Sequence, residues 1–474
     1  MSLPEMYPNP SLNNGENPGT APQLVVLESG SEQVSSDYPM KAPTNLTVAR
    51  LGPCTVASPL KETSFVPDGA QVLYHTCPDE LAKATADGSP PPAFERAGPR
   101  EKIYFDPKKL RCGIVTCGGL CPGLNDVIRA LVIELCDNYG TLPVIGFRYG
   151  YQGLVASYGH DVMELTPKTV GGIQYHGGTI LGSSRGHQDI GEMVDTLERM
   201  NIRVLFTLGG DGTQRAAALM AEEIERRGLK IGIVGLPKTI DNDIMYISQS
   251  FGFITAVAEA RRVIAAAHTE ARGVPNGIGL VKLMGRTSGW IAAYATLANS
   301  EVDFCLIPEQ PFRLDGEDGL MASLEKRLQK NNHAVIVAAE GAGQDLQPGE
   351  PDHDASGNLK LKDVGAFLRT AITEYFSSRD ITINLRYLDP SYTIRGARAD
   401  PTDAVFCQLL AQNAVHAAMA GRTNMLTGYW NGEFTHVPLH LVVGERKQVD
   451  VKGQFWQAVV STTSQPFTMG YDPG

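Results

Sequence analysis

Acidic residues set among glycines mark the first place where this sequence could act on a phosphate. Residues 209–213 read GGDGT, so Asp211 lies between Gly210 and Gly212, with the hydroxyl of Thr213 two positions on. A carboxylate in such a turn can hold a magnesium ion, directly or through water, while glycine N–H groups face phosphate oxygens. The motif predicts a magnesium ligand at Asp211, the alternative being a turn without a ligand.

Two more carboxylates follow in residues 237–243, which read PKTIDND. In an extended segment Asp241 and Asp243 point the same way, because they are two positions apart. One can accept a proton from an attacking hydroxyl, and the other can position a metal or a water. The alternative is that both form hydrogen-bonded turns in an ordinary loop.

A third turn, residues 118–125, reads GGLCPGLN and precedes a helical pattern. Its glycines let the backbone approach a phosphate, and a helix N-terminus offers free N–H donors. It matches the GxxxxG part of a Walker A loop, but Leu124 and Asn125 replace the Lys-Ser/Thr pair, so it is not that motif. A purely structural turn is the alternative.

Further side chains suit an anion or a polyol, because arginine forks hold phosphate and glutamate or tyrosine can hold hydroxyls. They follow later apolar runs of the chain: Met284, Gly285, Arg286, Glu340, Arg386, Tyr392 and Arg395.

Short β-rich runs must position these residues: 112–117, 203–208, 231–236, 278–284 and 334–339. Helical patterns alternate with them; Asn125 is expected to cap one helix that ends at Gly140, and residues 215–228 and 256–272 predict two more. Such alternation indicates parallel sheets covered on both faces. We expect an α/β fold of two doubly wound, mostly parallel-sheet Rossmann-like domains with an N-terminal extension. Ligands then bind beyond the carboxyl ends of the strands, where Asp211, Asp241 and Asp243 should converge on one magnesium–phosphate cleft.

Residues 1–101 are unlike the rest, with many prolines and little periodicity. Short apolar runs at 24–28, 63–67 and 71–75 could pack as arms on the globular body. We expect this extension to be partly irregular.

Composition excludes several classes of partner. The formal net charge of −11 argues against general affinity for nucleic acid or acidic membranes, so neither is expected as a partner. No run approaches the ~18 apolar residues of a membrane helix, and neither a secretory signal nor a peroxisomal address is visible, which favours the cytoplasm. The 8 cysteines are scattered without zinc-like spacing and are expected to be reduced.

Taken in order, GGLCPGLN, GGTILGSSRG, GGDGT, PKTIDND, MGR, the Glu340 strand end and DPSYTIRG resemble the 6-phosphofructokinase family. The similarity runs from about Lys102 to about His440 and is to the longer branch found in plants, trypanosomatids and some bacteria. It implies transfer of the γ-phosphoryl of ATP to the 1-hydroxyl of fructose 6-phosphate in glycolysis, with Mg²⁺ as cofactor. It also implies a homo-oligomer, a dimer or tetramer, whose active sites share arginines between subunits.

By motif, the resemblance assigns nucleotide binding to Gly118, Arg185, Gly186, Gly210, Asp211, Gly212 and Thr213. It assigns substrate binding to Thr239, Ile240, Asp241, Met284, Gly285, Arg286, Glu340, Arg386, Tyr392 and Arg395. Asp211 matches the metal ligand, and Asp241 matches the proton acceptor, for which an ordinary carboxylate pKa would suffice. Arg185 and Thr239 complete the implied catalytic group.

The same resemblance divides the chain. Residues 102–253 plus 394–440 should form the nucleotide-binding domain, and residues 254–393 the sugar-phosphate-binding domain. Residues 1–101 form the extension, and residues 441–474 a C-terminal segment.

Two positions bear on the phosphoryl donor. Gly212 is the small residue of ATP users and leaves room for the α-phosphate, which an aspartate would fill and repel. Lys238 resembles pyrophosphate users. The combination resembles the long ATP-dependent branch, so ATP is the expected donor and pyrophosphate the alternative. Gly277 replaces a phosphate-binding arginine of short bacterial enzymes, which leaves the other arginines or Lys282 to hold the sugar phosphate.

Rival interpretations remain open at this point. NAD and diacylglycerol kinases share GGDGT, but PKTIDND and DPSYTIRG favour the sugar kinase. A catalytically silent regulatory subunit is a further alternative, which the intact Asp211, Thr239, Asp241, Arg286 and Arg395 disfavour.

Overall fold

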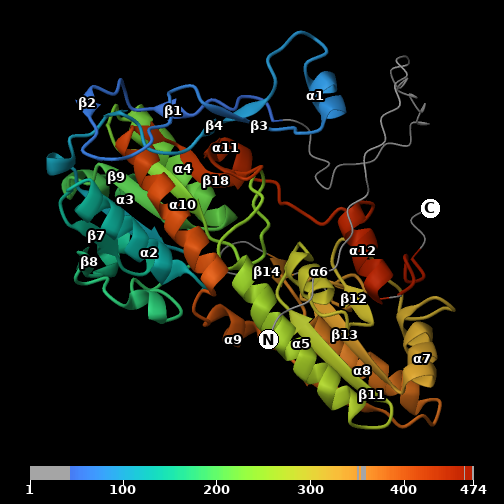
Figure 1. Ribbon diagram of the computed structural model, residues 1–474. Coiled ribbons are helices and arrows are strands. Elements are labelled where there is room, and N and C mark those ends of the chain that lie inside the picture. Colours follow the sequence, from blue (N-terminus) through green and yellow to red (C-terminus); the bar gives the residue numbers. More distant parts are fainter. Residues whose placement is uncertain (1–42, 350–351, 354–358, 464, 472–474) are drawn as a thin grey trace, which may run out of the picture.

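The computed structural model describes residues 43–349, 352–353, 359–463 and 465–471. Two α/β bodies, each built on its own sheet, are joined by segments that cross between them (Figure 1). The α/β architecture of two mostly parallel sheets that the strand–helix alternation predicted is confirmed. The residue boundaries of the four predicted domains remain a prediction.

The larger sheet has the strand order β3-β4-β19-β18-β10-β9-β6-β7-β8. Its centre is parallel and consists of β6 (Cys112–Thr116), β7 (Val144–Phe147), β9 (Val204–Gly209), β10 (Gly232–Pro237) and β18 (Met425–Trp430). The flanking strands pair antiparallel with their neighbours: β3 (Gln71–Leu73), β4 (Ala93–Arg96), β8 (Val162–Leu165) and β19 (Glu433–Pro438).

The smaller sheet is wholly parallel, in the order β12-β13-β11-β16. Its strands are β11 (Gly277–Leu283), β12 (Phe304–Leu306), β13 (His333–Ala339) and β16 (Asn384–Leu388). Two-residue strands pair antiparallel in three small sheets of their own: β1 (Ala49–Arg50) with β17 (Arg422–Thr423), β2 (Val56–Ala57) with β5 (Lys102–Ile103), and β14 (Asp352–His353) with β15 (Leu359–Lys360).

The helices link these strands and cover both faces of each sheet. In chain order they include α1 (Pro78–Ala84), α2 (Leu124–Ile133), α3 (Ile190–Arg199), α4 (Asp211–Arg226), α5 (Phe253–Arg272), α6 (Trp290–Leu297), α7 (Leu320–Asn331), α8 (Val364–Ser377), α9 (Ser391–Arg395), α10 (Pro401–Met419), α11 (Leu439–Val442) and α12 (Gln454–Thr463). None of the helices in the described part of the chain is long and apolar enough to span a bilayer.

Alternate residues of each strand enter different cores, as the period of two requires. In β9 the side chain of Phe206 lies in the core that holds α2 and α10, and that of Leu205 lies in the core that holds α3 and α4. The first of these cores continues across Val281 of β11 to the helices α5 and α6. One continuous apolar core therefore joins the two bodies, and this fixes the strand ends that carry the site.

One helix start differs from the prediction. The residue that caps α2 is Gly123 with φ +92°, and Asn125 lies within the helix. The Asn125 amide instead donates to the carbonyl of His176 at 3.0 Å, and its oxygen accepts from the N–H of Ile180, also at 3.0 Å. The predicted Asn125 cap is wrong because this side chain holds a segment distant in sequence. The helix continues past Ile133 as a π-turn, Glu134–Asn138.

The described part of the N-terminal extension packs on the body rather than standing apart. The run at 71–75 supplies β3, and Val66 donates its N–H to the carbonyl of Pro99 at 2.9 Å. The run at 24–28 lies outside the described residues. All 8 cysteines are unpaired, as expected of reduced thiols.

Candidate active site

Three neighbouring strands bring the three predicted turns together. Leu208 of β9 pairs with Thr116 of β6, and Gly209 pairs with Pro237 of β10. Beyond these pairs Cys117 donates its N–H to Leu208 at 2.9 Å, and Lys238 donates its N–H to Gly209 at 3.1 Å. The turns after β6, β9 and β10 therefore lie side by side at one edge of the sheet, as the parallel topology predicts.

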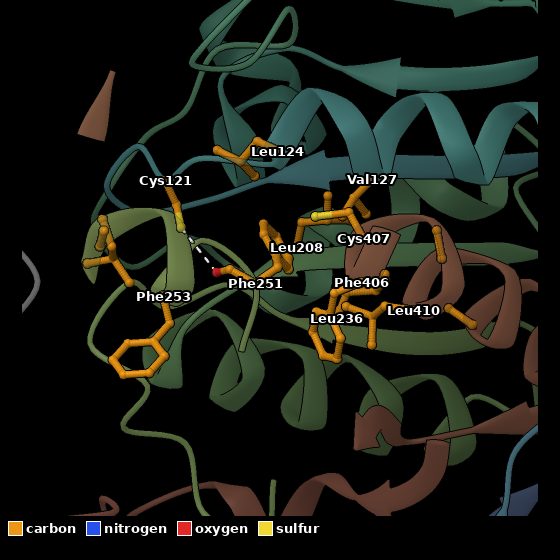
Figure 2. Packing of buried hydrophobic residues seen from close by; sticks show 14 of the residues in the cluster. Cys121, Leu124, Val127, Leu208, Leu236, Phe251, Phe253, Phe406, Cys407 and Leu410 are labelled. Atoms are coloured by element: carbon orange, nitrogen blue, oxygen red, sulfur yellow. Dashed lines mark hydrogen bonds between the residues drawn. The ribbon is translucent and has the colours of Figure 1, made fainter. Parts of the chain in front are cut away.

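The first turn, residues 118–125, is held in place by its contacts with buried residues. Figure 2 shows Cys121 beside Phe251, whose carbonyl accepts from the Cys121 thiol at 3.3 Å. Gly118 takes φ +84°, which favours glycine, and its N–H donates to Ser184 at 3.0 Å. A Cβ on Gly118 would lie 3.1 Å from Nζ of Lys238. The turn is thus a tight backbone cradle that a side chain would crowd.

Two cations lie over this cradle. The buried Lys238 donates to the carbonyl of Gly119 at 2.9 Å, and burial lowers the pKa of its ammonium. A Cβ on Gly119 would lie 3.2 Å from a guanidinium nitrogen of Arg185, so the exposed Arg185 reaches the same turn. Gly186 follows it with φ +99°. The structure thus brings Gly118 and Arg185 together, as predicted.

The second turn opens helix α4. Gly210 precedes the helix, Asp211 is its first residue, and the buried Thr213 has its carbonyl held by the Tyr151 hydroxyl at 2.8 Å. A Cβ on Gly212 would meet no atom within 4 Å. The space that an α-phosphate would need is open at this position.

The Asp211 carboxylate makes only two long contacts in the structure. One carboxylate oxygen lies 3.5 Å from Arg215, and the other lies 3.4 Å from the N–H of Gly444. Among the described residues, no group of three His, Cys, Asp or Glu side chains could form a metal cage. A magnesium ion here would therefore bind the Asp211 carboxylate together with substrate phosphates, the ligand set that Mg²⁺ favours.

The third turn carries a chain of hydrogen bonds that ends at Asp241. The Thr239 hydroxyl donates to Asp243 at 2.7 Å and accepts from the N–H of Asp241 at 3.3 Å. The other oxygen of Asp243 accepts from Arg446 at 3.0 Å. Ile240 is buried within the turn.

The Asp241 carboxylate differs from its neighbours in its hydrogen bonding. Its Oδ1 is buried and accepts no hydrogen bond from any residue that the structure describes. Burial, followed by the charges of Asp243 and Glu340, raises its pKa to about 7. An ordinary carboxylate pKa would suffice for the implied role, but burial and two neighbouring carboxylates place the pKa of Asp241 higher. A base with a pKa near neutrality suits proton abstraction.

The second body presents its own strand ends to this acid. Glu340 donates its N–H to Leu283 at 2.9 Å, and Gly341 donates its N–H to Gly285 at 3.0 Å, so the ends of β13 and β11 lie together. Gly285 takes φ +122°, and the preceding Met284 is fully buried. These contacts fix the turn that carries Arg286.

Burial raises the pKa of Glu340, and the nearby guanidinium groups of Arg395 and Arg286 oppose that rise. Arg395 acts in the same direction on Asp241. Two acids from different sheets therefore face one group of arginines between the bodies.

The remaining candidates for sugar-phosphate contacts differ in position. Lys282 forms ion pairs with Asp389 at 2.8 Å and Asp363 at 3.4 Å. Its positive charge is therefore already paired within the chain. Gly277 opens β11 at the opposite end of the strand, and a Cβ there would lie 2.0 Å from the carbonyl of Ala271. An arginine does not fit at this position without moving the end of α5.

Arg386 and Tyr392 stand apart within this chain. Arg386 is exposed on the edge strand β16, and Tyr392 is 87% exposed on α9. Over the described ranges no hydrogen bond or ion pair joins either residue to Asp241 or Glu340. Both face outward, where a neighbouring chain could meet them.

The sequence reasoning missed one component of the site. Gly444 and Arg446, from the segment after α11, contact Asp211 and Asp243 respectively. No local motif marks this segment, since the contacts arise only where the chain returns to the strand ends.

Comparisons with known proteins agree with this geometry. The phosphofructokinase family model matches residues 111–418. The chain therefore belongs to the phosphofructokinase family. An ATP-dependent 6-phosphofructokinase of Amycolatopsis methanolica is 49% identical over 90% of this chain and 96% of its own length. The ATP-dependent 6-phosphofructokinase 7 of Arabidopsis thaliana is 49% identical over 80% of this chain and 78% of its own.

The fold is shared more widely. The crystal structure of a pyrophosphate-dependent phosphofructokinase from Nitrosospira multiformis superposes with a TM-score of 0.63 at 19% identity, covering 77% of this chain and 93% of that one. At this identity the match concerns the fold alone. The resemblance to the long branch with plant members is confirmed by the closer relatives.

Proposed function

We propose that Asp241 removes the proton from the 1-hydroxyl of fructose 6-phosphate while that oxygen takes the γ-phosphoryl of ATP. The products are fructose 1,6-bisphosphate and ADP, and the reaction is a step of glycolysis. The observation that carries the proposal is the position of Asp241: a partly buried side chain whose buried Oδ1 has no hydrogen-bond partner among the described residues, facing the strand ends of both bodies.

Charge neutralisation and alignment supply most of the acceleration of a phosphoryl transfer, because its transition state is loose. Arg185 at the first turn and Arg286 and Arg395 at the second body would face the transferring group. Thr239 holds the segment that carries Asp241, since its hydroxyl accepts from the Asp241 N–H. Proton removal by Asp241 then adds about 10²–10⁴ in rate.

The nucleotide would bind across the turns after β6 and β9. Backbone N–H groups around Gly118, Gly186 and Gly210 suit phosphate oxygens, and Thr213 and Asp211 begin the helix behind them. Asp211, together with the nucleotide phosphates, would hold magnesium, which would supply positive charge to the transferring group.

The sugar phosphate would bind at the second body, against Met284, Gly285, Arg286, Glu340 and Arg395. Arg386 and Tyr392 complete such a site only from a neighbouring chain, because both face outward here. We therefore infer a homo-oligomer, a dimer or a tetramer, with shared active sites.

ATP is the donor that the site favours. The open space beside Gly212 accommodates an α-phosphate. Lys238 is the one residue that favours pyrophosphate, yet its ammonium is engaged with the carbonyl of Gly119. Pyrophosphate therefore remains the second candidate donor.

The test is an assay of purified protein with fructose 6-phosphate and either ATP or pyrophosphate at equal free magnesium. We expect turnover with ATP, little with pyrophosphate, and none after chelation of the metal. Turnover with pyrophosphate alone would reverse the donor assignment. Transfer to NAD or diacylglycerol in an acceptor screen, or nucleotide binding without turnover, would overturn the reaction itself. The cytoplasmic location stays a prediction, which cell fractionation would test.

A further inference from the structure

The segment after α11, residues 443–449, forms a strap between the two bodies. In Figure 1 the chain leaves α11 beside the larger sheet and crosses to α12, which packs against α6 of the smaller body. We call residues 443–449 the C-terminal strap. Its path passes the strand ends that carry the candidate active site.

On the first body the strap contacts two of the three acids. The N–H of Gly444 lies 3.4 Å from Asp211, and Arg446 donates to Asp243 at 3.0 Å. The backbone of Arg446 also pairs with Ile244, and the N–H of Lys447 donates to the carbonyl of Asp243 at 2.9 Å. The strap is thus paired with the turn that holds Asp241.

On the second body the strap is anchored beside Arg286. Gln448 donates to the carbonyl of Thr287 at 3.0 Å, and Glu309 accepts from the N–H groups of Val449 at 2.8 Å and Gly289 at 2.9 Å. Arg446 itself lies 3.5 Å from the Thr287 hydroxyl. The guanidinium is therefore held between the acid turn of one body and the arginine turn of the other.

We propose that Arg446 is a positioning residue for the transfer step, acting through Asp243 and Thr239 on the segment that carries Asp241. The inference rests on the proposed reaction. Arg446 binds one oxygen of Asp243, the other oxygen accepts from Thr239, and Thr239 accepts from the Asp241 N–H. These three contacts connect Arg446 to the Asp241 backbone without a break.

The consequence of losing Arg446 follows from the same chain of contacts. The Asp243 side chain is only 10% exposed, and without Arg446 its second oxygen would lose the guanidinium that holds it. The Asp243 carboxylate could then rotate, and the hydrogen bonds from Thr239 to Asp243 and from the Asp241 N–H to Thr239 would weaken. Charge-assisted hydrogen bonds of this kind support an expected loss of about 10- to 100-fold in kcat.

The experiment is a double-mutant cycle on the full chain. Arg446→Gln should lower kcat by about 10- to 100-fold while KM for ATP and for fructose 6-phosphate changes by less than about threefold. Asp243→Asn should lower kcat as well, and adding Arg446→Gln to it should cost little more. Arg446→Lys, which keeps the charge, should recover most of the rate and also serves if the glutamine variant folds poorly.

Gln448→Ala is the matched control, because it removes a strap contact to Thr287 without removing charge. It should keep the parental kcat, and its melting temperature should match that of Arg446→Gln. Additive losses in the cycle, or an equal loss of kcat in Gln448→Ala, would overturn the role of Arg446. A parental kcat in Arg446→Gln would do the same while leaving the proposed reaction intact, whereas failure of the proposed function would appear as an inactive parent.

Discussion

Asp241 combines burial with two acidic neighbours, and this combination sets how the rate should respond to pH. With a pKa of about 7, the carboxyl is mostly protonated below neutrality and cannot accept a proton. We expect kcat/KM for the sugar phosphate to fall about tenfold per pH unit below about pH 7 and to level off above it. A profile across this range, measured at saturating magnesium–ATP, checks the prediction.

The control for that profile is Asp241→Ser, whose residual rate should lack the same acidic limb. A parental profile that stays flat from about pH 6 to about pH 8 would show that Asp241 does not titrate as the base.

Gly212 provides a residue-scale test of donor choice. Gly212→Asp places a negative charge in the open space beside Asp211 and should lower kcat/KM for ATP by about 100-fold, since juxtaposed like charges cost several kcal/mol. Gly212→Ala adds only a methyl group to open space and should keep most of the activity. Equal ATP kinetics in the aspartate variant would remove this position from donor selection.

At the scale of elements, a buried ion cluster attaches the extension to β17, the short strand after α10. Arg422, whose side chain is fully buried, contacts Glu95 of β4 at 2.7 Å and Asp68 at 2.8 Å. Breaking a buried pair leaves an uncompensated charge, so Arg422→Met should lower the free energy of unfolding by about 3 kcal/mol. Denaturant unfolding of the purified protein measures this change.

The pair between Arg96 of β4 and Glu433 of β19 supplies an exposed comparison on the same edge of the larger sheet. Both side chains are nearly half exposed, at 44% and 45%, so Glu433→Ala should cost less than about 1 kcal/mol. Similar losses for the two variants would mean that the buried cluster does not anchor the extension.

Strands were easier to predict than helix ends or distant contacts. The runs at 203–208 and 231–236 became β9 (Val204–Gly209) and β10 (Gly232–Pro237), because continuous apolar segments bounded by glycine have few other places in a doubly wound fold. The Asn125 cap failed since its amide is used in tertiary contacts. Periodicity carries no information about such partners.

In the site, too, features local to one turn could be predicted, and contacts between distant residues could not. The motifs located Asp211, Thr239 and Asp241, whose chemistry is local to three turns. They did not reveal the raised pKa of Asp241, which depends first on burial and then on Asp243 and Glu340. Nor did they reveal Arg446, which reaches the site after some 200 further residues. Both effects exist only once the chain is folded.

At the scale of the whole molecule, the outward positions of Arg386 and Tyr392 predict sites completed by a second chain. Asp241→Ser and Arg386→Ala should each be nearly inactive alone. Chains of the two variants that are mixed, unfolded and refolded together should regain activity, because one site in each hybrid pair receives an intact Asp241 and an intact partner Arg386.

Mixing the two folded variants without refolding is the control, and it should restore much less activity. Absence of recovery in hybrids of verified mixed composition would mean that each chain completes its own site.

The most direct test of the account is the turnover of Asp241→Ser with ATP and fructose 6-phosphate. If this carboxylate accepts the hydroxyl proton, kcat should fall by about 10²–10⁴ while the fold and the affinity for fructose 6-phosphate are retained. Near-normal turnover in the folded variant would contradict the central role given to Asp241.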